Sequence, residues 1–245
     1  MEQTIFLSDD MIFYTIEGEG RYIGYPSIFM RMSMCNLTCM GFKSADSPYG
    51  CDSFVSWSVK NKKTFAEIFT ILENNKYIEQ FQRGAVLKLT GGEPFLQQKA
   101  LIEFIKAFAE KYGIMPKIDF ETNGTLMPDN IWADVFGATF TCSPKLTNNG
   151  DPEEKRYKPE VLSYLASRNA CFKFVVKSEE DIVEIYEKYI KPNIIPASLI
   201  WLMPCCGSRE EQNTISPVVA ELCKKYSFKF SPRLQLMIWN KALKV

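Results

Sequence analysis

Three cysteines and a downstream glycine pair are the residues of this chain best suited to chemistry. Cys35, Cys39 and Cys51 lie in one short segment near the N-terminus. Three thiolates can hold three irons of a four-iron cluster and leave the fourth iron open to a ligand. Residues 86–90 read as a strand followed by two glycines, which let the backbone approach a small molecule closely. The pattern predicts a cluster with an open position beside a small-molecule site.

The amino-acid composition excludes several kinds of catalytic and metal site. The chain contains no histidine, which excludes a Ser-His-Asp triad, a Cys-His nucleophile pair and histidine-bearing zinc sites. Its 29 basic and 29 acidic side chains balance, which argues against a general nucleic-acid binder. Eight cysteines without an export signal indicate metal ligands or free thiols, and no apolar run is long enough to span a membrane. We therefore expect a cytoplasmic protein that binds neither nucleic acid nor membrane.

Strand and helix patterns alternate along the chain. Strands are predicted at residues 27–32, 86–90, 117–121, 138–141, 171–176, 199–203 and 228–230. Helices are predicted at residues 64–81, 97–112, 179–190 and 217–226. This alternation predicts an α/β fold with a parallel sheet, as an incomplete (βα)6-type barrel in a single domain over residues 1–245. Chemistry is expected at the C-terminal ends of the strands.

Short motifs from residue 13 to the C-terminus carry a family resemblance. They are Glu17-Gly18-Glu19-Gly20, Gly24-Tyr25-Pro26-Ser27, Phe29-Met30-Arg31, Cys35-Asn36-Leu37-Thr38-Cys39, Cys51-Asp52-Ser53, Gly91-Gly92-Glu93-Pro94, Glu121-Thr122-Asn123-Gly124-Thr125, Ser143-Pro144-Lys145 and Ser231-Pro232-Arg233-Leu234. Together they resemble the 7-carboxy-7-deazaguanine synthases of the radical-SAM superfamily. The resemblance implies the partial barrel of that superfamily and a lyase that converts 6-carboxy-5,6,7,8-tetrahydropterin to 7-carboxy-7-deazaguanine with release of ammonia, in queuosine and 7-deazapurine biosynthesis.

The resemblance also implies cofactors and the residues that hold them. Cys35, Cys39 and Cys51 would bind a 4Fe-4S cluster, and its open iron would take S-adenosylmethionine. Ser53 would hold a magnesium ion beside the substrate. Contacts with S-adenosylmethionine would come from Gly50, Asp52, Gly92, Glu93, Ser143, Pro144, Lys145 and Ser178.

Substrate contacts and partners follow from the same resemblance. The substrate would meet Glu17, Gly18, Glu19, Arg31, Thr90 and the carboxylate of Val245. Arg31 and Glu19 would join the cysteines as catalytic residues. Arg31 is our candidate for the substrate carboxylate, because a guanidinium donates two parallel hydrogen bonds. An electron donor such as flavodoxin and a homodimer are also implied.

The chain departs from the family pattern at several positions. Residues 40–50 separate the second and third cysteines, where two residues are usual, and Phe42 stands where a cysteine would be expected. We interpret Cys51 as the displaced third ligand. Ser53 and Glu17 replace a common threonine and a common glutamine. Gln235 or Trp239 lies near the place of a histidine that is often found.

Other interpretations remain open at this stage. A glycyl-radical activating enzyme has a similar cysteine loop, but typically reads Gly-Pro-Gly at residues 18–20 and lacks the Ser-Pro-Lys turn. A non-enzymatic iron–sulfur regulator would need no pterin. The three cysteines could be structural zinc ligands or buried thiols, and Arg31 could form a structural ion pair. Glu17 and Glu19 could be solvated loop carboxylates, and Ser53 an ordinary turn residue.

Overall fold

A nine-stranded sheet organises the part of the chain that this computed structural model describes, residues 3–42 and 48–240. Its strands are β1 (Thr4–Ile16), β2 (Pro26–Met32), β3 (Asn61–Thr64), β4 (Val86–Gly91), β5 (Lys117–Thr122), β6 (Thr139–Cys142), β7 (Cys171–Val176), β8 (Ile200–Pro204) and β9 (Lys229–Phe230). They lie in the order β3-β1-β2-β4-β5-β6-β7-β8-β9. All neighbours from β2 to β9 are parallel, and β1 is antiparallel to both β2 and β3.

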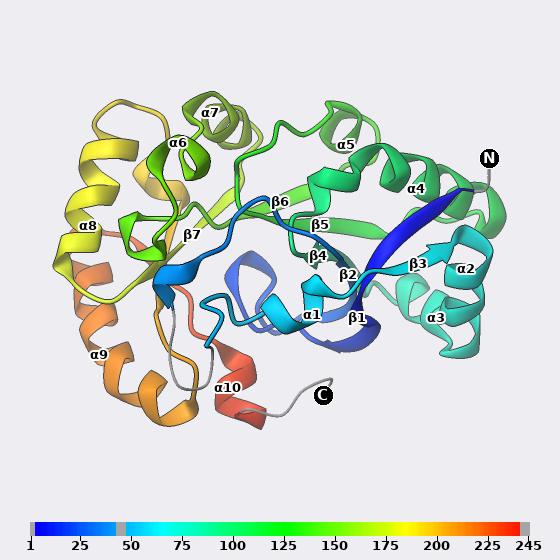
Figure 1. Cartoon of the computed structure of the whole chain (residues 1–245), viewed down its shortest axis with the longest axis horizontal. Helices are drawn as coiled ribbons and strands as arrows, with labels where there is room; N and C mark the ends of the chain where they lie inside the picture. Colours follow the sequence, from blue (N-terminus) through cyan, green and yellow to red (C-terminus); the bar gives the residue numbers. More distant parts are fainter. Residues whose placement is uncertain (1–2, 43–47, 241–245) are drawn as a thin grey trace.

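Helices connect the parallel strands and cover the sheet. They are α1 (Phe54–Ser58), α2 (Phe65–Asn74), α3 (Tyr77–Gln82), α4 (Gln98–Tyr112), α5 (Ile131–Asp134), α6 (Glu153–Arg156), α7 (Pro159–Ser167), α8 (Glu179–Ile185), α9 (Arg209–Tyr226) and α10 (Leu234–Trp239). In Figure 1 most of them surround three sides of the strands, while α1 and α10 lie on the remaining side. The predicted α/β class and mostly parallel sheet are confirmed, and the strand order follows the chain as an incomplete barrel requires.

The strands alternate between an apolar face and a polar face. On β4, Leu87 and Leu89 join the main hydrophobic core, whereas Lys88 and Thr90 point to the other face because successive side chains of a strand alternate. The apolar face packs against the helices, notably α4 with Phe104 and its neighbours. The other face gathers charged and hydroxyl side chains, which are Arg31, Lys88, Thr90, Asp119, Glu121, Thr139, Thr141 and Lys173. A sheet lined in this way positions polar groups for a site within the fold.

Two predicted helices have different bounds in the structure. The prediction of one helix over residues 64–81 is wrong, because α2 ends at Asn74 and α3 begins at Tyr77. The Asn75 side chain donates to the Ile71 carbonyl at 2.8 Å, and Lys76 adopts a left-handed φ of 58°, which ends the helix. The helix predicted at residues 217–226 begins at Arg209 instead. Pro217 therefore lies inside α9, although proline more often marks a helix start.

Two edge strands were not predicted. In β1 the register shifts between Leu7 and Ile12, and Met11 has a φ of 40°. This bulge interrupts the alternation that would have identified a strand. The strand β3 is only four residues long and mostly polar, so its sequence carries little strand signal. Both strands extend the parallel sheet beyond β2 and leave its order unchanged.

The most buried charge of the polar face allows a test of stability. The Lys88 ammonium lies 2.5 Å from Glu17 and 2.7 Å from Asp119, and all three side chains are buried. Removing one partner of a buried ion pair leaves uncompensated charge and costs about 3–5 kcal/mol. We expect Lys88→Met to lower the free energy of unfolding by that amount in denaturant titrations. Lys106→Met breaks an exposed pair with Glu103 and should change it by only about 0.5 kcal/mol. Equal midpoints for the two variants would contradict this expectation.

Candidate active site

The two glycines after β4 bring its end against the cysteine loop. Gly92 N donates to Met32 O at 3.0 Å, and Glu93 N donates to Met34 O at 2.8 Å. A Cβ atom at Gly92 would lie 1.8 Å from Met34 O, and Gly91 has a φ of 114°. Neither position can take a side chain without a shift of the backbone. The close approach that the glycines allow is therefore made to the backbone just before Cys35.

Each of the three candidate thiols accepts one hydrogen bond from a side-chain N–H group. The donors are Asn123 Nδ2 to Cys35 at 3.8 Å, Asn149 Nδ2 to Cys39 at 3.4 Å and Trp57 Nε1 to Cys51 at 3.5 Å. Cys39 also lies close enough to Cys35 and to Cys51 to influence the pKa of both thiols. The structure thus brings together the three cysteines that the sequence singled out.

The chemistry of these thiols fits a cluster. Burial raises the pKa of Cys35 to about 11 and raises the pKa of Cys39 and Cys51 as well. Iron ligation would remove these protons, and N–H donors stabilise the resulting thiolates. Among the described residues no three cysteine or acidic side chains converge as a single metal ion would require. The thiolates of a four-iron cluster bind different irons, so they need not converge on one point.

Asp151 holds the Cys39 segment in place. Its carboxylate accepts hydrogen bonds from Thr38 Oγ1 at 2.7 Å, from Cys39 N at 2.8 Å and from Asn149 Nδ2 at 2.8 Å. Burial opposes the charge of Asp151, but these donors lower its pKa overall. The contacts fix Cys39, whose φ is 52°. Asp151 lies far along the chain from the cysteines, and no motif spacing pointed to it.

The Ser-Pro-Lys turn lies beside the thiols. Ser143 N donates to Thr122 O at 2.8 Å, and Lys145 Nζ donates to Ser143 Oγ at 3.0 Å. Burial raises the pKa of Cys39, and the Lys145 ammonium is the largest opposing influence on it. Lys145 thus supplies positive charge at the edge of the candidate cluster site. Pro144, the middle residue of the same turn, is buried.

Glu93 is buried beneath this edge. Its carboxylate accepts from Phe95 N at 3.1 Å, from Asn123 N at 2.8 Å and from Thr122 Oγ1 at 3.0 Å. Burial raises the pKa of Glu93 to about 7 although these donors oppose the rise. The side chain fastens the Gly-Gly-Glu-Pro turn to the segment after β5, which also carries the donor to Cys35.

The remaining cofactor candidates occupy two separate loops. Gly50 packs against Cys39, since a Cβ atom there would lie 2.4 Å from Cys39 O. Asp52 accepts from Ser53 Oγ at 3.1 Å, and Ser53 is the N-cap of α1. Ser178 is the N-cap of α8 at the end of β7 and forms a capping box with Asp181.

Arg31 projects from β2, and no described carboxylate forms an ion pair with it. Its guanidinium carbon lies 5.4 Å from the centre of the Phe13 ring. Within residues 3–42 and 48–240, no ion pair involves Arg31 and its buried Nε has no hydrogen-bond partner. The structural ion pair that the sequence left open is thus not formed in this part of the chain. A cation stacked on an aromatic ring and otherwise unpaired is suited to bind an anionic group.

Glu17 and Glu19 are held by two different lysines. Glu17 pairs with Lys88, and burial raises its pKa to about 7 although Lys88 opposes the rise. Glu19 pairs with Lys173 and Arg233. Burial opposes its ionisation, but these two cations more than offset burial and lower its pKa. Both carboxylates are therefore part of a buried charge network and not solvated loop residues.

The other substrate candidates surround this network. Thr90 Oγ1 donates to Glu121 Oε2 at 2.8 Å, and Glu121 lies 3.8 Å from Lys88. Gly18 accepts from Leu234 N at 2.9 Å. Gln235 fills the space beside Gly18 and donates to Glu19 at 2.6 Å. Val245 lies outside the described residues.

Sequence reasoning missed several residues of this site. Lys88 and Lys173 each stand at an alternate position in a predicted strand, so strand alternation was the signal that could have placed them on the polar face. Arg233 was part of a quoted motif but received no role. Trp57 and Asn149 carried no signal, because a lone indole or amide in a loop indicates no function.

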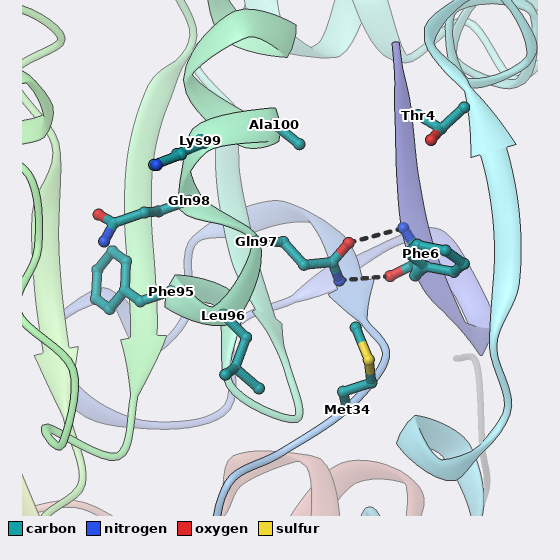
Figure 2. A pocket seen from close by; sticks show the side chains of 9 residues that line it. All are labelled: Thr4, Phe6, Met34, Phe95, Leu96, Gln97, Gln98, Lys99 and Ala100. Carbon is teal, nitrogen blue, oxygen red and sulfur yellow. Dashed lines mark hydrogen bonds between the residues drawn. The ribbon is translucent and has the colours of Figure 1, made fainter. Parts of the chain in front are cut away.

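A separate pocket lies on the other side of the Gly-Gly-Glu-Pro turn. It has a volume of about 450 Å³ and is lined by Thr4, Phe6, Met34 and residues 95–100. Figure 2 shows the Gln97 amide making two hydrogen bonds, each of 2.8 Å, with the backbone of Phe6 in β1. None of the candidate site residues lines it.

The fold and the thiol site define a class of protein. Residues 16–130 match the family described as a 4Fe-4S single cluster domain. The crystal structure of QueE from Escherichia coli has the same fold, with a TM-score of 0.62 over 94% of both chains at 19% identity. The chain is therefore an α/β protein with a mostly parallel sheet, part of which is similar to a 4Fe-4S cluster domain.

Curated relatives match nearly the whole chain and share one name. The chain is 29% identical over 93% of its length to a protein of Hyperthermus butylicus named 7-carboxy-7-deazaguanine synthase, of which the match covers 90%. A protein of the same name from Pyrobaculum aerophilum is 29% identical over 94% of both chains. Over nearly its whole length, the chain is therefore similar to proteins named 7-carboxy-7-deazaguanine synthase. No described helix is both long and apolar enough to cross a bilayer.

The displaced third thiol can be tested by iron content. We expect anaerobically reconstituted Cys51→Ala to lose stably bound iron, because only two of three thiolates remain. Cys142→Ala removes a thiol at the end of β6 that is buried in the hydrophobic core, and this variant should retain about four irons per chain. The measurement is iron and sulfide per polypeptide after gel filtration. Undiminished iron in Cys51→Ala would mean that the third ligand lies elsewhere.

Proposed function

We propose that this chain is a radical-SAM lyase that converts 6-carboxy-5,6,7,8-tetrahydropterin to 7-carboxy-7-deazaguanine with release of ammonia. The observation that carries the proposal is the set of three thiols that accept hydrogen bonds from side-chain N–H groups, on a fold whose polar sheet face carries Arg31 without an ion pair to any described residue. The shared name of the curated relatives supports the particular reaction. We further propose that residues 1–245 act as a single domain.

The proposed cofactors divide the work with the protein. When bound, a 4Fe-4S cluster and S-adenosylmethionine supply the one-electron and radical chemistry that starts the rearrangement. Cys35, Cys39 and Cys51 hold the cluster. The residues proposed to contact S-adenosylmethionine are Gly50, Asp52, Gly92, Glu93, Ser143, Pro144, Lys145 and Ser178. Of these residues, Lys145 carries a positive charge, and it is the strongest influence that lowers the pKa of Cys39. Its ammonium is therefore suited to bind the carboxylate of S-adenosylmethionine.

The substrate would lie over the polar face of the sheet. Arg31 donates to its carboxylate through two parallel hydrogen bonds. Glu17 and Glu19 accept hydrogen bonds from the ring, since Lys88 and Lys173 hold their carboxylates in fixed positions. Thr90 and Gly18 complete the proposed contacts, with the Val245 carboxylate as a further one. With no histidine in the chain, proton transfers fall to carboxylates, lysines or the substrate itself.

An anaerobic assay tests the proposal directly. Reconstituted, chemically reduced protein is given S-adenosylmethionine with and without carboxytetrahydropterin, and 5′-deoxyadenosine and deazaguanine are measured. Formation of 7-carboxy-7-deazaguanine supports the proposal. Cleavage of S-adenosylmethionine that never yields deazaguanine would favour an activating enzyme with a protein substrate, and no cleavage would favour an iron–sulfur regulator.

Arg31 provides a test of substrate recognition. Arg31→Lys keeps the positive charge but loses the paired-donor geometry, so the swap is not conservative at such a site. We expect a fall in kcat/KM for carboxypterin of roughly tenfold or more, which corresponds to at least about 1.4 kcal/mol, with normal iron content. Arg83→Lys changes an arginine that ends α3, remote from the thiols, and serves as the control. Equal kinetics for both variants would remove Arg31 from the substrate site.

Ser53 provides a test of the proposed magnesium site. Magnesium prefers six oxygen ligands and keeps several waters, so one hydroxyl and substrate oxygens can suffice. We expect Ser53→Ala to lower product formation and weaken its dependence on added magnesium, whereas Ser53→Thr retains the hydroxyl and should be tolerated. Ser58→Ala, at the other end of the same helix, is the matched control. A wild-type enzyme that is indifferent to magnesium, or a fully active Ser53→Ala, would contradict the assignment.

We also propose an electron donor, an oligomeric state and a cellular location for this protein. A low-potential donor such as flavodoxin would reduce the cluster, and a homodimer is the proposed assembly, both from the family resemblance alone. We also propose a cytoplasmic location, because all eight cysteines are free thiols, and a reducing compartment keeps thiols available. Light scattering of the reconstituted protein would test the assembly, and a monomer would contradict it.

A further inference from the structure

Arg233 joins three loops with a single side chain. Its Nε donates to Glu19 Oε1 at 3.1 Å, its Nη1 to the Cys206 carbonyl at 2.5 Å and its Nη2 to Asp52 Oδ2 at 3.0 Å. Every nitrogen of the guanidinium thus contacts a different segment. Glu19 follows β1, Cys206 follows β8 and Asp52 belongs to the cysteine loop. Arg233 itself precedes α10, which Figure 1 shows near α1 on the side of the sheet that the other helices leave uncovered.

The contact with Asp52 matters because of where Asp52 lies. It directly follows Cys51, the thiol separated from Cys39 by residues 40–50. The Asp52 side chain is exposed, so packing does not fix it. Three described contacts near Cys51 are Gly50 against Cys39 O, the Trp57 N–H to Cys51 Sγ, and Arg233 with Asp52. The last of these is the one that reaches across to another part of the site.

We propose that Arg233 is a positioning residue that couples the third cluster thiol to the substrate loop. The proposal rests on the proposed function in taking Cys51 as a cluster ligand and Glu19 as a substrate contact. A guanidinium is planar and presents its donors in a rigid fork. A displacement of Glu19 by substrate is therefore transmitted to Asp52, and the coupling between the two sites must be reciprocal.

The charges of Glu19, Asp52 and Arg233 agree with this geometry. Burial opposes ionisation of Glu19, and Lys173 and Arg233 together lower its pKa nonetheless. The exposed Asp52 carboxylate pairs with the same guanidinium, at 3.0 Å from Arg233 Nη2. Arg233 thus forms an ion pair with both carboxylates. Charge-assisted hydrogen bonds of this kind are about twice as strong as neutral ones.

The chain offers a matched control in Arg209. Its side chain also ties the C-terminal part of the structure together, with Nε donating to Leu236 O at 3.2 Å and Nη2 to Ile238 O at 3.3 Å. These contacts join α9 to α10, and none of them reaches Glu19 or Asp52. Replacing Arg209 therefore weakens the attachment of α10 and leaves the two loops paired with Arg233.

The first experiment measures how firmly iron is held. Wild type, Arg233→Gln, Asp52→Asn and Arg209→Gln are reconstituted anaerobically, and transfer of iron to a ferrous chelator is followed without substrate. We expect roughly tenfold faster release in Arg233→Gln and in Asp52→Asn, within the range for residues that orient metal ligands, and wild-type release in Arg209→Gln. The double variant Arg233→Gln/Asp52→Asn should be no faster than the faster single variant, because both changes remove one contact.

The second experiment reads the coupling itself. Carboxytetrahydropterin should change the electron paramagnetic resonance spectrum of the reduced wild-type cluster, and this change should be absent in Arg233→Gln and present in Arg209→Gln. Arg233→Lys should not restore it, because lysine lacks the fork. If Arg233→Gln proves unfolded by circular dichroism, Asp52→Asn reports the same contact from an exposed position.

The outcomes separate this proposal from the proposed function. Iron release and spectra that are the same in Arg233→Gln and in Arg209→Gln would overturn the role of Arg233, even if the wild type makes deazaguanine. A wild type that yields no deazaguanine would overturn the proposed function. In that case faster iron release from Arg233→Gln would still support its action on the third thiol.

Discussion

The buried ammonium of Lys88 is the interaction on which the polar face depends. A parallel sheet with helices on one face leaves its other face to be filled, and here that face carries several carboxylates. Taking such charges out of water is costly unless each has a partner. Lys88 meets Glu17 and Asp119 directly and Glu121 at longer range. By holding two carboxylates of β5 and one from the loop after β1, it makes a charged interior compatible with folding.

The thiol site depends on that sheet through short backbone contacts. The end of β4 lies against the cysteine loop because glycine occupies the two positions of closest approach. Glu93 then fastens this turn to the segment after β5, which supplies the N–H donor to Cys35. Asp151 and Asn149, from beyond β6, hold Cys39 in the same way. The segments that follow β4, β5 and β6 therefore position the thiols of Cys35 and Cys39 together.

Sequence reasoning succeeded where a local pattern reports a local structure. The alternation in residues 86–90 and 171–176 predicted β4 and β7, and the cysteines with Gly91-Gly92 indicated the site. It failed where the deciding contact is distant in sequence. The break between α2 and α3 depends on a left-handed Lys76, and the partners of the thiols come from loops that no spacing rule connects. Lys88 and Lys173 lay within predicted strands, yet their role depends on carboxylates from other segments.

The contact of Gly50 with Cys39 has a consequence for the evolution of this loop. The carbonyl of Cys39 and the α-carbon of Gly50 meet at the base of the segment that separates the second and third thiols. A segment closed at its base can gain or lose residues with little change in the separation of its ends, and the entropy of closing it grows only slowly with length. The number of residues between two ligands is then a poor measure of the distance between them. On this physical ground, a change in the length of this stretch need not move the three sulfurs.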